Sequence, residues 1–199
     1  TYEIWSSTVP GDVITTVQVI EDLTDDGIKD IFVSSTLAGN GYLAFINGYD
    51  GSIIYVSKPL GFEPQKAVYV DGYVAVSSLN AVHLYDSNLN HIYVILSDHT
   101  PKKLQVFGED IIFLDGNTIK CCVISTGGLR WTLHSDGNLE DVLALSERRI
   151  VCASKINSEF TLNLLDDYGN ILSSLELGYG EKIYLGAYDG SHFFYTLLN

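Results

Sequence analysis

Residues 22–30, DLTDDGIKD, hold the densest group of side chains that could do chemistry, with four aspartates and one glycine in nine positions. The apolar stretches VQVI before them and IFVSS after them are typical of strands, so the acids lie in a tight bend. Carboxylates this close together repel one another unless a cation neutralises them. Two interpretations are open: a bound cation, or an ordinary polar turn of Asx type with solvated acids.

Composition limits the class of protein. Apolar residues make up 46% of the 199-residue chain, which is enough for a substantial core and excludes a disordered segment. Lys and Arg number 11 against 25 Asp and Glu, so the formal net charge is −14. Phosphate backbones and anionic lipid repel such a chain, and no apolar run reaches the roughly 18 residues of a membrane helix. We expect a protein partner or self-assembly, no nucleic acid, and no direct membrane insertion in this segment.

The chain begins at Thr1, contains no methionine and shows no signal-peptide pattern. This combination predicts a processed mature chain or an excised fragment.

Short strands dominate the pattern. Segments of five to eight residues rich in Val, Ile, Tyr, Phe and Thr alternate with Gly, Asp and Asn, and no stretch has a helical period. The first four strands are expected at residues 13–21, 30–36, 41–47 and 52–57.

The pattern then repeats with a period of about 40 residues. The anchors of the repeat are spaced by 38, 38 and 42 residues and lie at Gly51, Leu89, Gly127 and Gly169. Five residues before each anchor is an apolar column: Ile46, Leu84, Cys122 and Leu164. Four residues after the anchors stand Tyr55, Tyr93, Trp131 and Ser173. Four strands in each such period indicate a β-propeller blade, with a β-sandwich or barrel as the alternative.

The fold class predicted is therefore all-β: a single β-propeller domain of four-stranded antiparallel blades, with about five blades or part of a larger ring. The blades are expected near residues 11–58, 65–97, 102–135 and 139–177, with a last one made of 182–199 and 1–8. Closure between the two ends is favoured because an unpaired apolar end strand is an aggregation hazard.

Two motifs carry a resemblance to known families. TGGLRW at 126–131 resembles the T-G-x-x-x-W ending of quinoprotein-like (PQQ-like) propeller repeats, and YDGSIIY at 49–55 resembles a degenerate copy. VIEDLTDDGIKDIFVSS at 19–35 is similar to the FG-GAP (integrin-like) blade motif. These families include cell-surface, adhesion and scaffolding proteins as well as enzymes, so the resemblance alone does not decide function.

The FG-GAP resemblance implies a calcium site. Oxygen ligands come from alternate loop positions, and glycine permits the sharp turn. The ligands implied are the side chains of Asp22, Thr24, Asp26 and Asp30 and the Ile28 carbonyl. Thr24 departs from the family pattern, which has Asp or Asn there, so weaker binding is expected; Asp25 should face water.

The three cysteines are expected to be packed free thiols. Adjacent cysteines resemble the vicinal disulfide of quinoprotein alcohol dehydrogenases, but IKCCVIS reads as a strand interior, where neighbours point to opposite faces. Cys122 belongs to the apolar column, and Cys121 shares a mixed column with Phe45, His83 and Asn163. Cys152 is the third cysteine of the chain. Three cysteines do not show whether the protein belongs to an oxidising or a reducing compartment.

No catalytic arrangement is visible. The histidines lack metal-site spacing, and no nucleophile-elbow, P-loop or dinucleotide fingerprint occurs. We predict a non-enzymatic extracellular or cell-surface propeller that acts as a structural or protein-interaction module. A diverged quinoprotein-type oxidoreductase or a propeller hydrolase is the alternative, although only Trp131 fits the column of docking tryptophans that a quinoprotein needs. The histidines lie at His83, His91, His99, His134 and His192.

Overall fold

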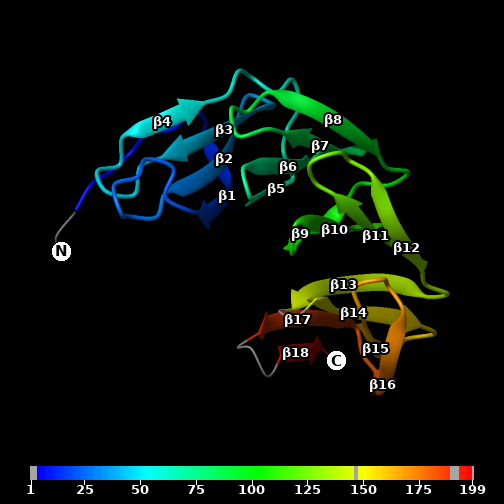
Figure 1. Ribbon diagram of the computed structural model, residues 1–199. Coiled ribbons are helices and arrows are strands. Elements are labelled where there is room, and N and C mark those ends of the chain that lie inside the picture. The colour runs from blue at the N-terminus through cyan, green and yellow to red at the C-terminus, as the bar shows by residue number, and fades with distance from the viewer. Residues whose placement is uncertain (1–3, 146–147, 189–192, 199) are drawn as a thin grey trace. The chain divides into compact units, whose positions relative to one another are not determined.

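The computed structural model describes residues 4–145, 148–188 and 193–198, in which there are eighteen β-strands and no α-helix (Figure 1). Each sheet is built from strands that follow one another in the sequence and pair antiparallel. Several of these pairs are joined by two-residue turns, such as Asp71–Gly72 and Asn157–Ser158. The all-β class and the four-stranded antiparallel sheets predicted from the sequence are confirmed.

The chain divides into two compact units, Thr1–Leu96 and Ser97–Asn199, each described here by itself. The first unit contains two sheets in the order β1-β2-β3-β4 and β5-β6-β7-β8. Their strands are β1 (Val13–Val19), β2 (Ile31–Leu37), β3 (Asn40–Ile46), β4 (Ile53–Val56), β5 (Lys66–Val70), β6 (Tyr73–Ser77), β7 (Ala81–Tyr85) and β8 (His91–Leu96).

The second unit contains two four-stranded sheets and one of two strands. The strands are β9 (Lys102–Phe107), β10 (Asp110–Asp115), β11 (Thr118–Val123), β12 (Leu129–His134), β13 (Asn138–Leu145), β14 (Arg149–Ile156), β15 (Glu159–Leu165), β16 (Ile171–Tyr179), β17 (Lys182–Tyr188) and β18 (Phe193–Leu198). Within this unit β13 lies against both β9 and β17, so the sheets pack through their first strands.

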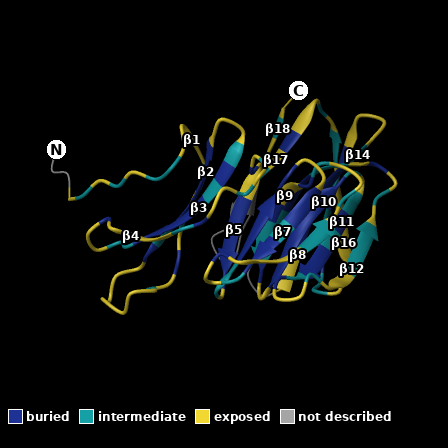
Figure 2. Ribbon diagram, turned by 90° about the horizontal axis from the view of Figure 1, so that it is seen from above, coloured by how far each residue is buried: buried dark blue, intermediate teal, exposed yellow. Residues whose placement is uncertain are grey.

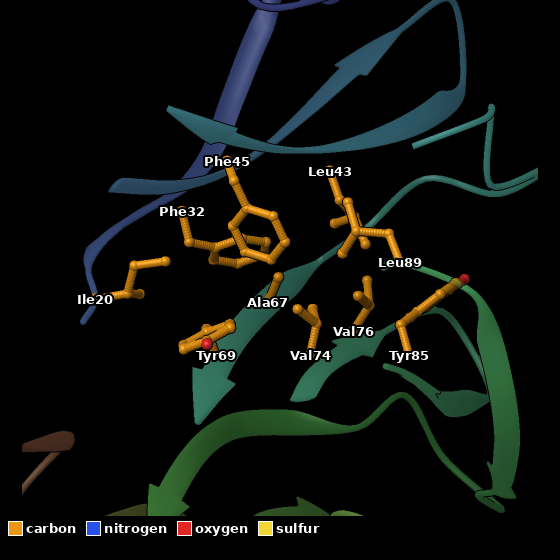
Figure 3. Close-up of a cluster of buried hydrophobic side chains, with 10 residues drawn as sticks. All are labelled: Ile20, Phe32, Leu43, Phe45, Ala67, Tyr69, Val74, Val76, Tyr85 and Leu89. Atoms are coloured by element: carbon orange, nitrogen blue, oxygen red, sulfur yellow. The ribbon is translucent and has the colours of Figure 1, made fainter. Parts of the chain in front are cut away.

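The core of the first unit lies between its two sheets (Figure 3). Phe32, Leu43 and Phe45 of the first sheet face Tyr69 and Val76 of the second, and all five are at most 3% exposed. The Phe45 and Tyr69 rings meet edge to face, 5.6 Å between centroids, the geometry that aromatic pairs prefer. Burial is concentrated in middle strands of the four-stranded sheets, such as β2 and β10, while outer strands such as β1, β8 and β16 are largely exposed (Figure 2).

The repeat columns occupy equivalent places. The apolar column lies on the third strand of its sheet each time; Ile46, Leu84 and Cys122 are buried and Leu164 is half-buried. The anchor column falls in the turn between the third and fourth strands, where φ is positive in all four cases: 75° at Gly51, 56° at Leu89, 69° at Gly127 and 81° at Gly169. The repeat in the sequence therefore marks a turn position with a left-handed backbone conformation, which glycine adopts without strain.

The N-terminal segment differs from its expected form. Residues 1–8 were expected to add a strand to the last blade, but the described part of this segment, residues 4–8, carries no strand pairing. Trp5 instead packs on the turn between β3 and β4. The rest of this predicted blade includes residues 1–3, 189–192 and 199, which lie outside the described residues, and ring closure stays a prediction.

Candidate functional site

The aspartates of residues 22–30 bind backbone N–H groups of their own loop. Asp22 accepts hydrogen bonds from the N–H groups of Thr24, Asp26 and Gly27, at 3.1, 3.3 and 2.6 Å. Burial alone would raise the pKa of the Asp22 carboxyl, but these three donors together lower it below its ordinary value. Asp26 accepts the N–H of Ile28 at 2.8 Å, which closes the turn.

The loop also holds the neighbouring turn between β3 and β4. Asp30 is fully buried, and its two oxygens accept the N–H groups of Leu23 and Gly48, at 2.7 and 3.0 Å. The Asn47 side chain donates to Asp26 at 2.9 Å and to Thr24 at 3.3 Å. The acids thus fasten residues 22–30 to the turn at residues 47–51.

These contacts bear on the predicted calcium ligands. Each carboxylate has two oxygens with about four lone-pair sites, so Asp22, Asp26 and Asp30 can accept these N–H groups and still ligate a cation. The contacts therefore fit both the polar turn and a calcium loop. Among the described residues, no group of three or more His, Cys, Asp or Glu side chains is placed to hold a metal ion. Asp25 is exposed and its φ is 57°. The calcium site stays a prediction of the sequence.

Both tryptophans of the chain dock on such turns. The Trp131 ring, from β12, covers Gly169 in the turn between β15 and β16, and its Nε1–H donates to the Asp167 carbonyl at 2.8 Å. A Cβ added to Gly169 would lie 2.8 Å from the ring, so only glycine permits this contact. Trp5 covers Gly51 in the same way and donates to the Gly48 carbonyl at 3.0 Å.

The corresponding place in the first unit has no tryptophan. Tyr55 on β4 pairs with Phe45 as Trp131 pairs with Cys121, and Leu89 holds the turn position of Gly169. The Leu89 side chain is buried in the core, and Tyr55 is 45% exposed.

A groove of about 620 Å³ remains at this place. Its wall is mostly aromatic and apolar, it includes one lysine and two histidines, and it contains no acid. The lining consists of Tyr55, Ser57, Lys58, Pro59, Leu60, Phe62, His83, Tyr85, Leu89, Asn90, His91 and Val94. A volume within the range of ligand sites, with aromatic walls and few polar groups, makes the groove the candidate functional site.

Packing fixes two histidines in the groove. The His83 ring stacks on Phe62 with 4.1 Å between centroids, and Tyr85 meets the His91 ring edge to face at 5.2 Å. His83 Nε2 lies 3.2 Å from Ser78 Oγ, and His83 Nδ1 lies 3.4 Å from His91 Nε2. Burial, and next the proximity of His91, lower the pKa of His83 to about 4, so this ring is neutral near pH 7.

Sequence reasoning did not single out the groove. Its one signal is the column of Phe45, His83, Cys121 and Asn163, where a histidine stands in place of the buried Phe45 and Cys121 and the half-buried Asn163 of the other third strands. The groove itself forms between two sheets, and residues of the link at 57–62 line it. The repeat period and the spacing of residues in the sequence do not reveal a groove between two sheets.

The cysteines are not part of a reactive site. All three are free and buried, which confirms the predicted packed thiols. Burial raises the pKa of Cys121 to about 12 and the pKa values of Cys122 and Cys152 to about 11. Thiols of this kind are unreactive near neutral pH.

Comparisons with known proteins identify the fold. No family model matches the chain, and no curated protein is similar to it in sequence. The structure of BBS1N in complex with ARL6DN is similar over 91% of this chain and 57% of that chain, with 15% identity and a TM-score of 0.68. The Pan2 WD40 domain of Neurospora crassa is similar over 92% and 60%, with 12% identity and a TM-score of 0.56. BamB from Moraxella catarrhalis is similar over 81% of this chain and 49% of that chain, with 15% identity and a TM-score of 0.53.

These likenesses show a β-propeller-type fold, and at such identities they show the fold alone. The chain spans less than two thirds of the length of each of these three chains. The PQQ-like and FG-GAP resemblances have no matching family model and stay predictions. No helix among the described residues is long and apolar enough to cross a membrane.

Proposed function

We propose that this protein is a non-enzymatic protein-interaction module of the β-propeller type, which binds an aromatic side chain of a partner protein in the groove between β4 and β7–β8. The observation that carries the proposal is the groove itself. Its walls are aromatic and lack acids, although the chain as a whole has a net charge of −14. Aromatic anchors in such grooves account for much of the affinity of many protein interfaces.

Two features support the choice of an aromatic side chain. Elsewhere in the chain the equivalent place is filled by a tryptophan, Trp5 on one turn and Trp131 on another. In the groove, Phe62 and Tyr85 offer ring faces and edges, the geometry in which aromatic side chains pack. An aromatic ring from a partner protein would fill the place that a tryptophan fills at the other turns and that Tyr55 leaves open.

An interaction role also agrees with the structural neighbours. BBS1N, whose fold resembles this one, was crystallised with the protein ARL6DN. An extracellular or cell-surface location, calcium stabilisation, and the alternative oxidoreductase or hydrolase activity are further predictions from the sequence. The acidic, lysine-poor composition is what favours the first of them.

Peptide selection tests the groove. We would select short random peptides on the full chain and on a Tyr55→Ser variant, with Tyr93→Ser as the matched control. Tyr55 and Tyr93 are both exposed on fourth strands, at 45% and 49%, but only Tyr55 lines the groove.

We expect peptides rich in Trp, Tyr or Phe that bind the wild type and Tyr93→Ser alike and bind Tyr55→Ser at least tenfold more weakly. Enrichment of peptides without aromatic residues, equal loss in both variants, or no enrichment would each contradict the proposal.

A further inference from the structure

We propose that His83 and His91 form a binding site for a borderline transition-metal ion such as Zn²⁺, Ni²⁺ or Cu²⁺, open toward the groove. This inference is independent of the proposed aromatic ligand. It is carried by the distance between two ring nitrogens and by the contacts that fix each ring.

The hydrogen bonds of His83 are compatible with a proton on Nε2. Ser78 Oγ lies 3.2 Å from the Ala81 carbonyl oxygen, to which it can donate its single proton. Ser78 Oγ then accepts a hydrogen bond from His83 Nε2, 3.2 Å away. The lone pair of His83 is then on Nδ1, the atom that faces His91 Nε2. A metal-bound histidine commonly donates its other ring N–H in this way.

The separation of the nitrogens fits a shared metal. The distance of 3.4 Å from His83 Nδ1 to His91 Nε2 is longer than a good hydrogen bond, which spans about 2.7–3.2 Å. Two zinc–nitrogen bonds of about 2.0–2.1 Å at the tetrahedral angle place their nitrogens about 3.3–3.4 Å apart. The pair therefore needs little movement to bind an ion between its rings.

The surroundings select the metal class. The groove wall contains no carboxylate, so it lacks the oxygen ligands that Ca²⁺ and Mg²⁺ require. Neutral imidazole suits Zn²⁺, Ni²⁺ and Cu²⁺. Phe62 and Tyr85 hold the two rings, which keeps the pair in place before the ion arrives. The remaining coordination positions face the groove, where water or a donor from a bound molecule completes the shell.

Calorimetry with metal salts tests the site. We would titrate ZnCl₂, and separately NiCl₂, into the untagged full chain after treatment with a chelator. The key variant is His91→Gln, because His91 is exposed and its replacement leaves the core intact. The matched control is His134→Gln, an exposed histidine on β12 outside the groove.

We expect saturable binding of one ion by the wild type and by His134→Gln, and affinity at least tenfold weaker in His91→Gln. In ¹⁵N spectra, zinc should shift His83 Nδ1 and His91 Nε2 and leave the His99 and His134 rings unchanged. Equal binding by His91→Gln, shifts centred on other histidines, or no binding by the folded wild type would overturn the proposal.

Discussion

The two units join neighbouring sheets in contrasting ways. In the second unit, Trp131 from the outer strand β12 covers Gly169 of the next sheet and donates to a backbone carbonyl. In the first unit, Tyr55 and Leu89 hold these two positions, and a groove of about 620 Å³ remains. One repeat position therefore serves packing in one junction and leaves a groove in the other.

The chemistry of the turn residue explains the difference. A tryptophan ring lies flat on a turn only where that turn has no Cβ, as at Gly169. At the equivalent position Leu89 turns its side chain into the core, which stabilises the sheet and prevents a ring from lying on the turn. Tyrosine is also smaller than tryptophan and lacks the indole N–H.

The largest expected effect is at the glycine under Trp131. Gly169→Ala puts a Cβ 2.8 Å from the ring at a φ of 81°, so both steric overlap and backbone strain oppose folding. We expect a loss of about 3 kcal/mol in the free energy of unfolding, measured with urea. The control is Gly178→Ala, at a φ of 86° with nothing within 4 Å of the added atom, which should lose about 1 kcal/mol. Equal losses would mean that the ring contact adds nothing.

The next effect separates the two outer-strand aromatics. Trp131→Phe removes the hydrogen bond to the Asp167 carbonyl and part of the buried ring, and should cost about 2 kcal/mol. Tyr55→Phe changes a half-exposed residue with no comparable contact and should stay within about 0.5 kcal/mol. Similar losses in urea unfolding would show that the first junction depends on its aromatic side chain as well.

Acid should act on the groove junction through His83. The pKa of His83 is about 4 in the folded chain, below the ordinary value of 6.5 that applies when unfolded. The unfolded chain therefore gains a proton first, and stability falls as the pH drops from about 6.5 toward 4. Because His83 is partly exposed, we expect a loss on the order of 1 kcal/mol, with a chelator present. His83→Gln should remove this loss of unfolding free energy, measured by urea unfolding across the same pH range. The same pH dependence in His83→Gln and in the wild type would contradict the prediction.

The smallest expected effect concerns the acidic loop. Its carboxylates accept N–H groups without an ion, and the polar-turn interpretation predicts a melting temperature that changes little with millimolar calcium or with a chelator. A calcium site instead predicts stabilisation by about 2.7 kcal/mol at a hundredfold excess over the dissociation constant. Asp26→Asn should then weaken the calcium response, and Asp25→Asn should not. That outcome would favour the calcium site and overturn the polar-turn interpretation.

The sequence by itself determined the fold class and the repeat. Strand periodicity reflects which residues are buried, and glycines in turns reflect a positive φ. Both are local properties that can be read from short segments of sequence. The column of Ile46, Leu84, Cys122 and Leu164 was therefore expected to hold equivalent positions, and all four residues lie on third strands. The short acidic loop was recognised for the same reason, as a dense polar bend between two strands.

Only the tertiary structure decided what the side chains contact. The acids of residues 22–30 bind N–H groups, one of them from a turn 18 residues away in the chain. Trp5 was expected in a strand, but its ring docks on Gly51. The histidine groove arises because a tyrosine and a leucine stand where another junction has tryptophan and glycine. Each outcome depends on the shape between packed sheets, which is set by contacts distant in sequence and leaves no periodic signal.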